Sequence, residues 1–337
     1  MKLAIHHRNN SFSDRWIQFC QENNIDFKIV DAFHSNIIDH LKDCDAFMWH
    51  HHHVDFKDVI VAKKILFALE HANIKVFPDF KTGWHFDDKV AQKYLLEAIN
   101  APLVPSYVFY DKQQALNWAK ETTYPKVFKL KGGAGASNVK LVRSYSQAIA
   151  LINTAFGCGF AQFDRLGYFK ERFNKFKNGK DNFIGVLKGF ARIFIVPKFA
   201  KQQPTERGYI YFQEFIPNND SDIRVIVIGN KAFAIKRMVR ENDFRASGSG
   251  NIVYDKNEIN LSCVNLAFEV NRKIESVCTA FDFVIHDGKP LIVEISYGFA
   301  ISAYDNCSGY WDHNLHWYES KFNPQEWILN NLISRLK

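Results

Sequence analysis

The first 80 residues alternate short apolar runs with segments of helical length, and this alternation is the feature that most constrains the fold. Strands are predicted at 2–6, 27–30, 46–49 and 75–77, and helices at 14–23, 37–41 and 59–71. Parallel strands need a crossover element between them, so strands separated by helices of this length are typical of a small parallel sheet. We expect a parallel α/β domain over residues 1–85.

The pattern then changes in two steps. Asp87 or Asp88 can cap a helix that ends near residue 98, followed by a strand at 107–110, a helix at 113–121 and two hairpin-like segments at 126–131 and 139–142. After Gly208 strands dominate. We predict an antiparallel meander of 209–216, 223–228 and 232–238, a helix at 265–277, a hairpin of 281–286 with 291–295, and a last helix at 324–336.

A length of 337 residues is too great for one typical core and suits two or three packed subdomains. We expect boundaries that give subdomains 1–85, 86–210 and 211–337. No apolar run approaches the ~20 residues that cross a bilayer, and the first residues turn polar at once. Six scattered cysteines without a C-x-x-C pair indicate free thiols in a reducing compartment, so a cytoplasmic location is expected.

The positive charge is concentrated in one stretch. Residues 164–201 hold ten Lys or Arg against three acids, which equals the formal net charge of +7 of the whole chain. Phe169, Phe173 and Phe176 fall at helical spacing within it. One interpretation is an amphipathic helix pair with a solvated basic face; the other is a basic insertion that docks on an anionic surface or polyanion. No recognition motif supports nucleic acid.

A strand ending in lysines runs into small residues at 126–137. Backbone N–H groups and an ammonium can lie against phosphate oxygens there, because glycines carry no Cβ to block the approach. A plain hairpin loop explains the same pattern. The lysines precede the glycines, so this is not a Walker motif.

Asp282 and Glu294 lie on the two strands of the predicted 281–295 hairpin. Two carboxylates that face each other repel unless a cation lies between them, and Mg²⁺ held by carboxylates and substrate phosphates satisfies this need. Alternatively, each carboxylate pairs with a basic neighbour.

The order of these segments resembles the ATP-grasp superfamily, and most closely its branch of ribosomal-protein glutamate ligases and glutathione synthetases. The resemblance is carried by the segments 213–216 (Gln-Glu-Phe-Ile), 222–225 (Asp-Ile-Arg-Val), 235–237 (Ile-Lys-Arg) and 243–245 (Asp-Phe-Arg). It covers roughly residues 86–300. It implies an α+β ATP-grasp fold, in which two α/β lobes clasp ATP, preceded by the small parallel α/β domain.

The resemblance also implies a role for each motif. ATP phosphates would be contacted by Lys89, Lys129 and Lys131, under a flap that includes Gly132, Gly133, Gly135 and Ser137. The adenine would lie against Gln213, Glu214, Phe215 and Ile216, and the ribose against Asp222. Mg²⁺ would be bound by Asp282, Glu294 and Ser296. The transferred phosphate would face Arg224, Arg237 and Arg245, because phosphoryl transfer to a carboxylate brings two anions together.

Two positions depart from the branch. Ser296 stands where the last metal segment normally has Asn, and Ser247 follows Arg245 where Asn is usual. A hydroxyl binds Mg²⁺ more weakly than an amide oxygen, so the number of metal ions is open.

Histidines follow two of the predicted strands. If the N-terminal sheet is parallel, 6–8 (His-His-Arg) and the run 50–53 (four His) lie at its carboxyl edge, where ligands usually bind. Structural or solvated histidine is favoured over a metal site, since four consecutive His cannot all face one ion. One or two of them can also donate hydrogen bonds to an anionic substrate.

The sequence therefore predicts an ATP-dependent carboxylate–amine ligase that uses ATP and Mg²⁺ and forms an amide through an acyl phosphate. The basic aromatic insertion favours an acceptor larger than a free amino acid, such as a sugar acid or surface-glycan precursor, and the chain also resembles ATP-grasp proteins of bacterial polysaccharide biosynthesis. The alternatives are a kinase that phosphorylates a hydroxyl and a non-catalytic nucleotide-binding module. A homodimer is a further option.

Overall fold

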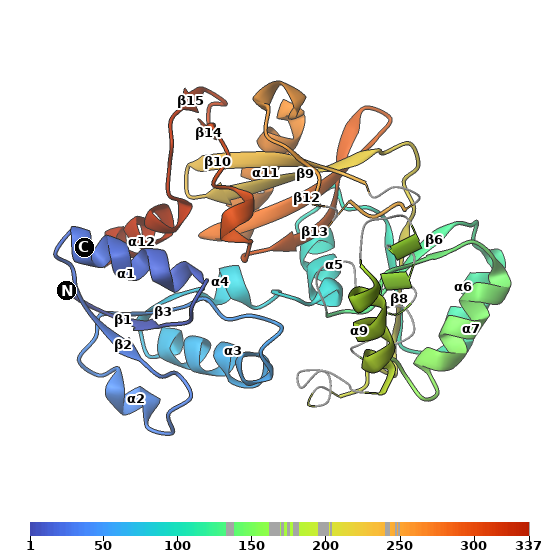
Figure 1. The fold of residues 1–337 in the computed structure, drawn as a ribbon, viewed down its shortest axis with the longest axis horizontal. Helices are drawn as coiled ribbons and strands as arrows, with labels where there is room; N and C mark the ends of the chain where they lie inside the picture. The colour runs from blue at the N-terminus through green and yellow to red at the C-terminus, as the bar shows by residue number, and fades with distance from the viewer. Residues whose placement is uncertain are drawn as a thin grey trace. The chain divides into compact units, whose positions relative to one another are not determined.

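The computed structural model describes residues 1–132, 138–161, 169, 172–173, 176–177, 182–194, 202, 204–239, 243–246, 248 and 250–336. The chain divides into two compact units, residues 1–104 with 216–337, and residues 105–215 (Figure 1). The six cysteines are free, as the sequence predicted. In the described part of the chain, no helix is both long and apolar enough to cross a membrane.

The first unit begins with the parallel sheet that the alternation predicted. Its order is β2-β1-β3-β4, built from β1 (Lys2–His6), β2 (Asp26–Val30), β3 (Ala46–Trp49) and β4 (Lys75–Phe77), and each neighbouring pair is parallel. The connecting helices are α1 (Phe12–Glu22), α2 (Ile37–His40) and α3 (Phe56–His71), and α4 (Phe80–Gly83) follows the last strand. Asp55 caps α3 by accepting the backbone N–H of Lys57, which fixes where that helix starts.

The same unit holds a larger sheet. Among the described residues its order is β13-β12-β9-β10-β14-β15, with β11 paired to β10. The strands are β9 (Ser221–Ile228), β10 (Lys231–Met238), β11 (Ile252–Val253), β12 (Cys278–His286), β13 (Lys289–Ser296), β14 (Gly309–Asp312) and β15 (Trp317–Glu319). The predicted β12–β13 hairpin is confirmed. Its turn holds Asp287 and Gly288 at positive φ, a conformation that Asp and Gly tolerate best.

Alternation along β9 divides its side chains between two cores. Ile223, Val225 and Val227 pack with residues of α11 (Leu261–Ile274). Ile226 and Ile228 instead belong to a core shared with the N-terminal sheet, α1 and α12 (Pro324–Ser334). Since residues two apart share a face, Arg224 and Asp222 lie on the face of that second core. Helix α5 (Lys89–Ala98), capped by Asp88 as predicted, also belongs to this unit.

Among its described residues, the second unit is built on a four-stranded antiparallel sheet of order β5-β8-β6-β7. Its strands are β5 (Ser106–Phe109), β6 (Lys126–Lys129), β7 (Lys140–Val142) and β8 (Ile210–Glu214). Helices α6 (Lys112–Glu121) and α7 (Tyr145–Ala155) bury Ala115 and Ile152 against Phe128 and Phe212. Helix α9 spans Phe183–Phe194.

The predicted meander of 209–216 with the next two strands is wrong. β9 and β10 do pair, but β8 belongs to the other sheet, between β5 and β6. Residues 215–220 separate β8 from β9 and include Pro217, whereas Gly229 and Asn230 form a two-residue turn between β9 and β10. A tight turn enforces pairing, and the longer proline-containing connection does not.

Candidate active site

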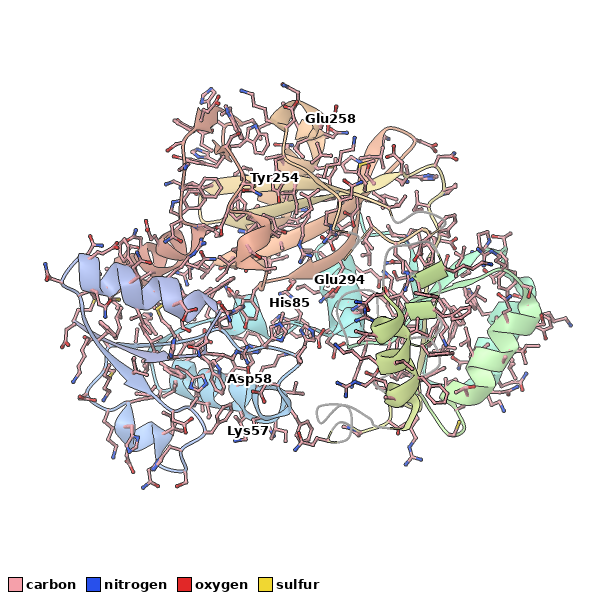
Figure 2. All side chains as sticks on the ribbon, viewed as in Figure 1. Lys57, Asp58, His85, Tyr254, Glu258 and Glu294 are labelled. Carbon is pink, nitrogen blue, oxygen red and sulfur yellow. The ribbon has the colours of Figure 1, made fainter. Side chains whose placement is uncertain are left out.

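A row of charged side chains crosses three strands of the larger sheet. Arg224 on β9 is the register partner of Asp282 on β12, and Asp282 is the partner of Glu294 on β13. Directly opposite residues of paired strands project to the same face, so these three side chains form one row. The facing of the two carboxylates is as the sequence predicted. Glu294 is labelled in Figure 2.

Each carboxylate of the row has a basic neighbour. Asp282 Oδ2 lies 3.0 Å from Arg237 Nη2, and its Oδ1 lies 3.4 Å from Arg224 Nε. Glu294 Oε1 lies 3.2 Å from Lys89 Nζ, and the Lys89 side chain is only 6% exposed. Lys89 is the first residue of α5, so the Asp88 cap fixes the backbone from which this ammonium extends. The ion-paired alternative is therefore the arrangement that these residues adopt.

Arg237 and Asp222 extend the row into a buried network. The guanidinium of Arg237 donates through Nε and Nη2 to the two carboxylate oxygens of Asp222, at 2.7 and 2.6 Å. Burial raises the pKa of Asp222 against the opposing effect of Arg237. For Arg237, burial favours a lower pKa, but the charges of Asp282 and Asp222 outweigh it and the pKa is raised. Because buried ion pairs contribute little net stability, such a network next to an apolar core indicates a functional site.

The donors in this row fit Mg²⁺ chemistry in part. Asp282 and Glu294 supply two carboxylates on adjacent strands, and the Ser296 hydroxyl, which donates to the backbone oxygen of Gly298 at 3.0 Å, is two residues further along β13. Among the described residues, no group of three or more His, Cys, Asp or Glu is placed to bind a metal ion. Mg²⁺ commonly takes one or two carboxylates and completes its shell with phosphate and water, so two are sufficient. A bound ion would compete with Lys89 and Arg237 for them.

Arg245 lies in the segment after β10. Its Nε donates to Asp243 Oδ2 at 2.8 Å, and although burial raises the pKa of Asp243, its hydrogen bonds from Arg245 lower it overall. Arg245 thus has a local carboxylate partner. Ser247, which stands where Asn is usual in the resembling branch, lies outside the described residues.

In the second unit, two predicted nucleotide contacts meet on adjacent strands. Lys129, at the end of β6 and 6% exposed, donates from Nζ to Gln213 Oε1 of β8 at 2.6 Å. Glu214 accepts from Lys126 Nζ at 2.7 and 2.8 Å and from the Tyr107 hydroxyl at 3.0 Å. Sequence reasoning missed Lys126, because its pairing with Glu214 depends on the register of β6 and β8, and the two residues are 88 positions apart.

The remaining predicted nucleotide residues of this region are placed only in part. The backbone N–H of Lys131 donates to the Tyr209 hydroxyl at 2.8 Å, and Gly132 follows in a bend. Gly133, Gly135 and Ser137 lie outside the described residues. Phe215 ends the second unit and Ile216 resumes the first.

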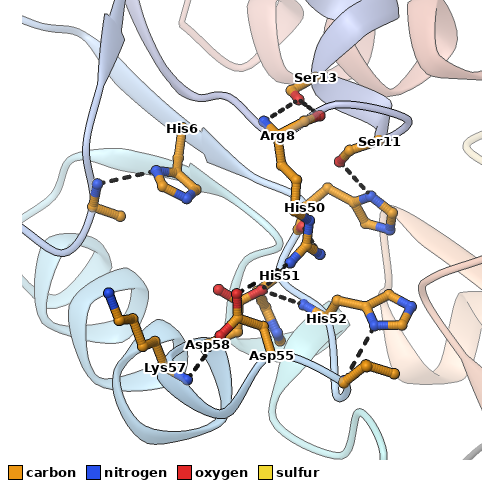
Figure 3. A network of polar contacts seen from close by, with 12 residues as sticks. His6, Arg8, Ser11, Ser13, His50, His51, His52, Asp55, Lys57 and Asp58 are labelled. Carbon is orange, nitrogen blue, oxygen red and sulfur yellow. Dashed lines mark hydrogen bonds and ion pairs between the residues drawn. The ribbon is translucent and has the colours of Figure 1, made fainter. Parts of the chain in front are cut away.

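The histidine runs do lie at the carboxyl edge of the N-terminal sheet, because β1 and β3 are parallel neighbours (Figure 3). His50 Nδ1 lies 2.8 Å from the Ser11 hydroxyl, and its ring stacks on Phe12 at 3.8 Å. His51 and His53 have pKa values of about 3, because burial disfavours the charged ring. These histidines are neutral, which agrees with the structural interpretation.

Sequence reasoning missed Asp58, in the first turn of α3, where an acidic residue looks like an ordinary helix start. Its side chain is 1% exposed and accepts the backbone N–H of His52 at 2.6 Å. Burial raises the pKa of this carboxyl to about 6. A buried carboxylate costs stability unless it is paired, and the partner of Asp58 is Arg8, whose Nη1 lies 3.0 Å from Asp58 Oδ2.

Two family descriptions match the sequence. Residues 200–309 match the RimK-like ATP-grasp domain, and residues 88–181 match the carbamoyl-phosphate synthase L chain, ATP binding domain. No curated protein matches the sequence. The first match contains the four segments that carry the resemblance noted in the sequence, and the second contains the lysine-rich and glycine-rich stretch 126–137.

Solved structures share the fold. A D-alanine–D-alanine ligase from Bacillus anthracis complexed with ATP superposes with a TM-score of 0.59 at 11% identity, covering 100% of this chain and 98% of the other. A RimK domain ATP-grasp protein from Sphaerobacter thermophilus superposes with a TM-score of 0.53 at 14% identity, covering 91% of this chain and 95% of the other. A D-cycloserine synthetase superposes with a TM-score of 0.58 at 13% identity, covering 100% of both chains. At these identities the likeness concerns the fold. The two family matches and this fold identify the chain as a member of the ATP-grasp superfamily.

Proposed function

We propose that this protein is an ATP-dependent carboxylate–amine ligase. The γ-phosphoryl group of ATP passes to a substrate carboxylate, giving an acyl phosphate and ADP; an amine then attacks the acyl carbon, forming an amide and releasing phosphate. The observation that carries the proposal is the row of Arg224, Asp282 and Glu294, with Lys89 and Arg237 at its carboxylates. It combines carboxylates for a metal with guanidinium groups for an anion, which phosphoryl transfer between two anions requires.

We assign different roles to the carboxylates and the guanidinium groups of the row. Asp282 and Glu294, with the Ser296 hydroxyl, would hold Mg²⁺, which when bound neutralises phosphate charge. Arg237 is clamped by Asp222 through two hydrogen bonds, so its guanidinium is fixed before any substrate arrives. Arg224 forms a looser ion pair, with its Nε 3.4 Å from Asp282 Oδ1, and both guanidinium groups would offer positive charge to the transferred phosphoryl group. Asp222 would therefore orient Arg237 besides any contact with the ribose.

For the nucleotide, we propose Lys129, Lys131 and the 132–137 segment at the phosphates and residues 213–216 at the adenine. Replacing Lys129 by Ala is expected to weaken MgATP binding by about 10- to 100-fold, since hydrogen bonds to charged groups contribute roughly 1.5–3 kcal/mol. Calorimetric titration measures this. Lys140→Ala, an exposed position on β7, is the matched control. An affinity equal to that of the wild type would remove Lys129 from the phosphates.

A panel of carboxylates with hydroxylamine as a general amine tests the reaction class. We expect MgATP-dependent ADP release only when a carboxylate is present, with a hydroxamate as product. A phosphorylated alcohol formed without any amine would instead indicate a kinase. Absence of MgATP binding would argue against both a ligase and a kinase. Sugar acids belong in the panel, because we propose a glycan-related acceptor.

We also propose that the protein is located in the cytoplasm. Its free cysteines are compatible with that reducing compartment.

We also propose that α9 contacts an anionic membrane surface. Ile184, Leu187 and Phe190 lie on one side of this helix and are 59, 52 and 52% exposed. Its buried Gly189 faces Arg172, which a Cβ would approach to 3.2 Å, so that side of α9 is packed. Phe190 lies at the border of the packed side, with its ring 6.1 Å from the ring of Phe169. Exposed Lys177, Lys188 and Arg192 accompany this apolar ridge, in the stretch that carries the +7 excess. An apolar ridge beside basic residues is typical of interfacial helices.

Replacing Lys177, Lys188 and Arg192 together by Gln is expected to weaken co-sedimentation with phosphatidylglycerol-containing vesicles, by about 1 kcal/mol for each residue. Wild-type binding should fall as salt rises and be weak on phosphatidylcholine vesicles. The matched control replaces Lys112, Lys120 and Lys140, which are also exposed in the second unit. Equal and salt-insensitive co-sedimentation of the wild type and both variants would show that these basic residues form a solvated surface and do not bind the membrane.

A further inference from the structure

The loops after β1 and β3 form a second polar cluster in the first unit, here called the edge cluster: Arg8, Ser13, residues 50–53, Asp55 and Asp58. His6 at the end of β1 is the register partner of Trp49 at the end of β3, so both loops leave the same edge of the parallel sheet. Figure 3 shows the Arg8 side chain extending from the first loop toward Asp58. Ligands of parallel α/β sheets commonly bind at this edge.

Arg8 is held firmly at one side. Its Nη1 lies 3.0 Å from the buried Asp58 Oδ2, and its Nη2 donates to the backbone oxygen of His50 at 3.4 Å. Its backbone is fixed as well, because the N–H of Arg8 donates to the Ser13 hydroxyl and that hydroxyl donates to the Arg8 oxygen, both at 3.1 Å. The guanidinium is therefore oriented without substrate.

The other side of Arg8 remains available. Its side chain is 33% exposed, whereas Asp58 behind it is 1% exposed, so the positive group faces solvent and the negative group is buried. No described residue accepts a hydrogen bond from Arg8 Nε. A guanidinium has five N–H donors and matches the geometry of a carboxylate. Asp55 lies 3.8 Å from Arg8 Nη1 and is 40% exposed, and its negative charge favours a bound group with one charge, such as a carboxylate, over one with two, such as a phosphate.

The edge cluster adjoins the charged row of the same unit. The Tyr297 hydroxyl donates to the backbone oxygen of His51 at 2.7 Å, and Tyr297 follows Ser296 directly. A Cβ on Gly298 would lie 3.5 Å from His50 Nε2. The charge of Lys89, which pairs with Glu294, is also felt by the His53 ring and helps to lower its pKa, after burial and His52.

We propose that Arg8 binds a carboxylate of the substrate other than the group that reacts, with Asp58 as its positioning residue. The substrate class is thus a small molecule that carries an additional free carboxylate. This inference rests on the proposed ligase function and adds a specificity-determining residue to it. The neutral histidines beside Arg8 supply hydrogen-bonding groups without a charge that would bind anions indiscriminately.

Arginine-specific labelling with phenylglyoxal tests this on the intact chain, with glutarate as the probe and glutaramide as the uncharged match. Peptide mapping should show Arg8 labelled about threefold more slowly at a glutarate concentration twice the dissociation constant, because protection follows mass action. Glutaramide should not protect. Arg335, 45% exposed and paired with Asp79, is the internal control. Equal labelling of Arg8 with and without glutarate would overturn the proposal.

Variants separate this inference from the proposed function. Asp58→Asn should reduce glutarate protection of Arg8 because the guanidinium loses its charged anchor, while MgATP affinity measured by calorimetry stays unchanged. Arg8→Gln should raise the KM of a carboxylate-bearing substrate and leave MgATP affinity and KM for the uncharged analogue unchanged; Arg8→Lys should restore part of the loss. ADP release that is indifferent to Arg8 would refute the inference alone, whereas absence of MgATP binding would refute the proposed function.

Discussion

Glu294→Gln is expected to lower ADP formation by 100-fold or more while the fold stays intact. A metal ion contributes several kcal/mol of transition-state charge stabilisation, and a loss of about 3 kcal/mol corresponds to a factor of over 100. Gln keeps the side-chain volume and can still accept a hydrogen bond from Lys89, which is 3.2 Å from Glu294 in the present structure. Thermal unfolding of the variant should therefore resemble that of the wild type.

Two further measurements make this result specific. The Mg²⁺ concentration needed for half-maximal nucleotide binding should rise in Glu294→Gln. Glu258→Gln is the control, because Glu258 is 52% exposed and pairs with Lys236 at 2.8 Å, away from the charged row. Activity of Glu294→Gln within a few-fold of the wild type would remove Glu294 from the metal site.

Acidification from pH 7 to 5 is expected to destabilise the first unit through its buried histidines, which include His51 and His85. Their pKa values are about 3 and about 4, because burial disfavours the charged rings. A histidine in the unfolded chain has a pKa near 6.5, so as the pH falls below that value the unfolded state binds protons that the folded state excludes. Each ring then costs about 2 kcal/mol by pH 5.

Asp58 acts in the opposite direction. Its pKa of about 6 lies above the ordinary value of 3.8, so the folded state binds a proton first and gains about 1 kcal/mol by pH 5. The net loss from these three groups is about 2–3 kcal/mol in the free energy of unfolding. His53, whose pKa is also about 3, adds to this loss, so denaturant titrations at the two pH values should show a difference of at least this size. His85→Phe should remove about 2 kcal/mol of the pH dependence. His313→Asn, at an exposed position, should leave it unchanged. Equal pH dependence of His85→Phe and the wild type would show that His85 is protonated in the folded state.

The sequence predicted those features that depend on local signals. The β12–β13 hairpin follows from its Asp287-Gly288 turn. The register that this turn sets would place Asp282 opposite Val293, and a register shift between Asp282 and Phe283 places it opposite Glu294 instead. The parallel N-terminal sheet follows from the strand–helix alternation. These signals are short in range, so one sequence suffices to recognise them.

Features that depend on distant contacts were not predictable. Nothing in residues 210–214 indicates pairing with β5, about 100 residues earlier, so β8 was assigned to the wrong sheet. Similarly, Asp58 meets Arg8 across 50 residues through the packing of α3 beside β1 and β3. In sequence it is an ordinary acidic residue in the first turn of a helix. The partners of charged residues, rather than their identities, are what the structure adds.

Oxygen-18 labelling tests the central claim most directly. A carboxylate substrate identified in the hydroxylamine panel is labelled in its carboxyl oxygens and turned over with MgATP and an amine. Formation of an acyl phosphate transfers one labelled oxygen to the released phosphate, so phosphate with one heavy atom is the predicted product. Unlabelled phosphate, or phosphate retained on a hydroxyl of the substrate, would contradict the ligase mechanism.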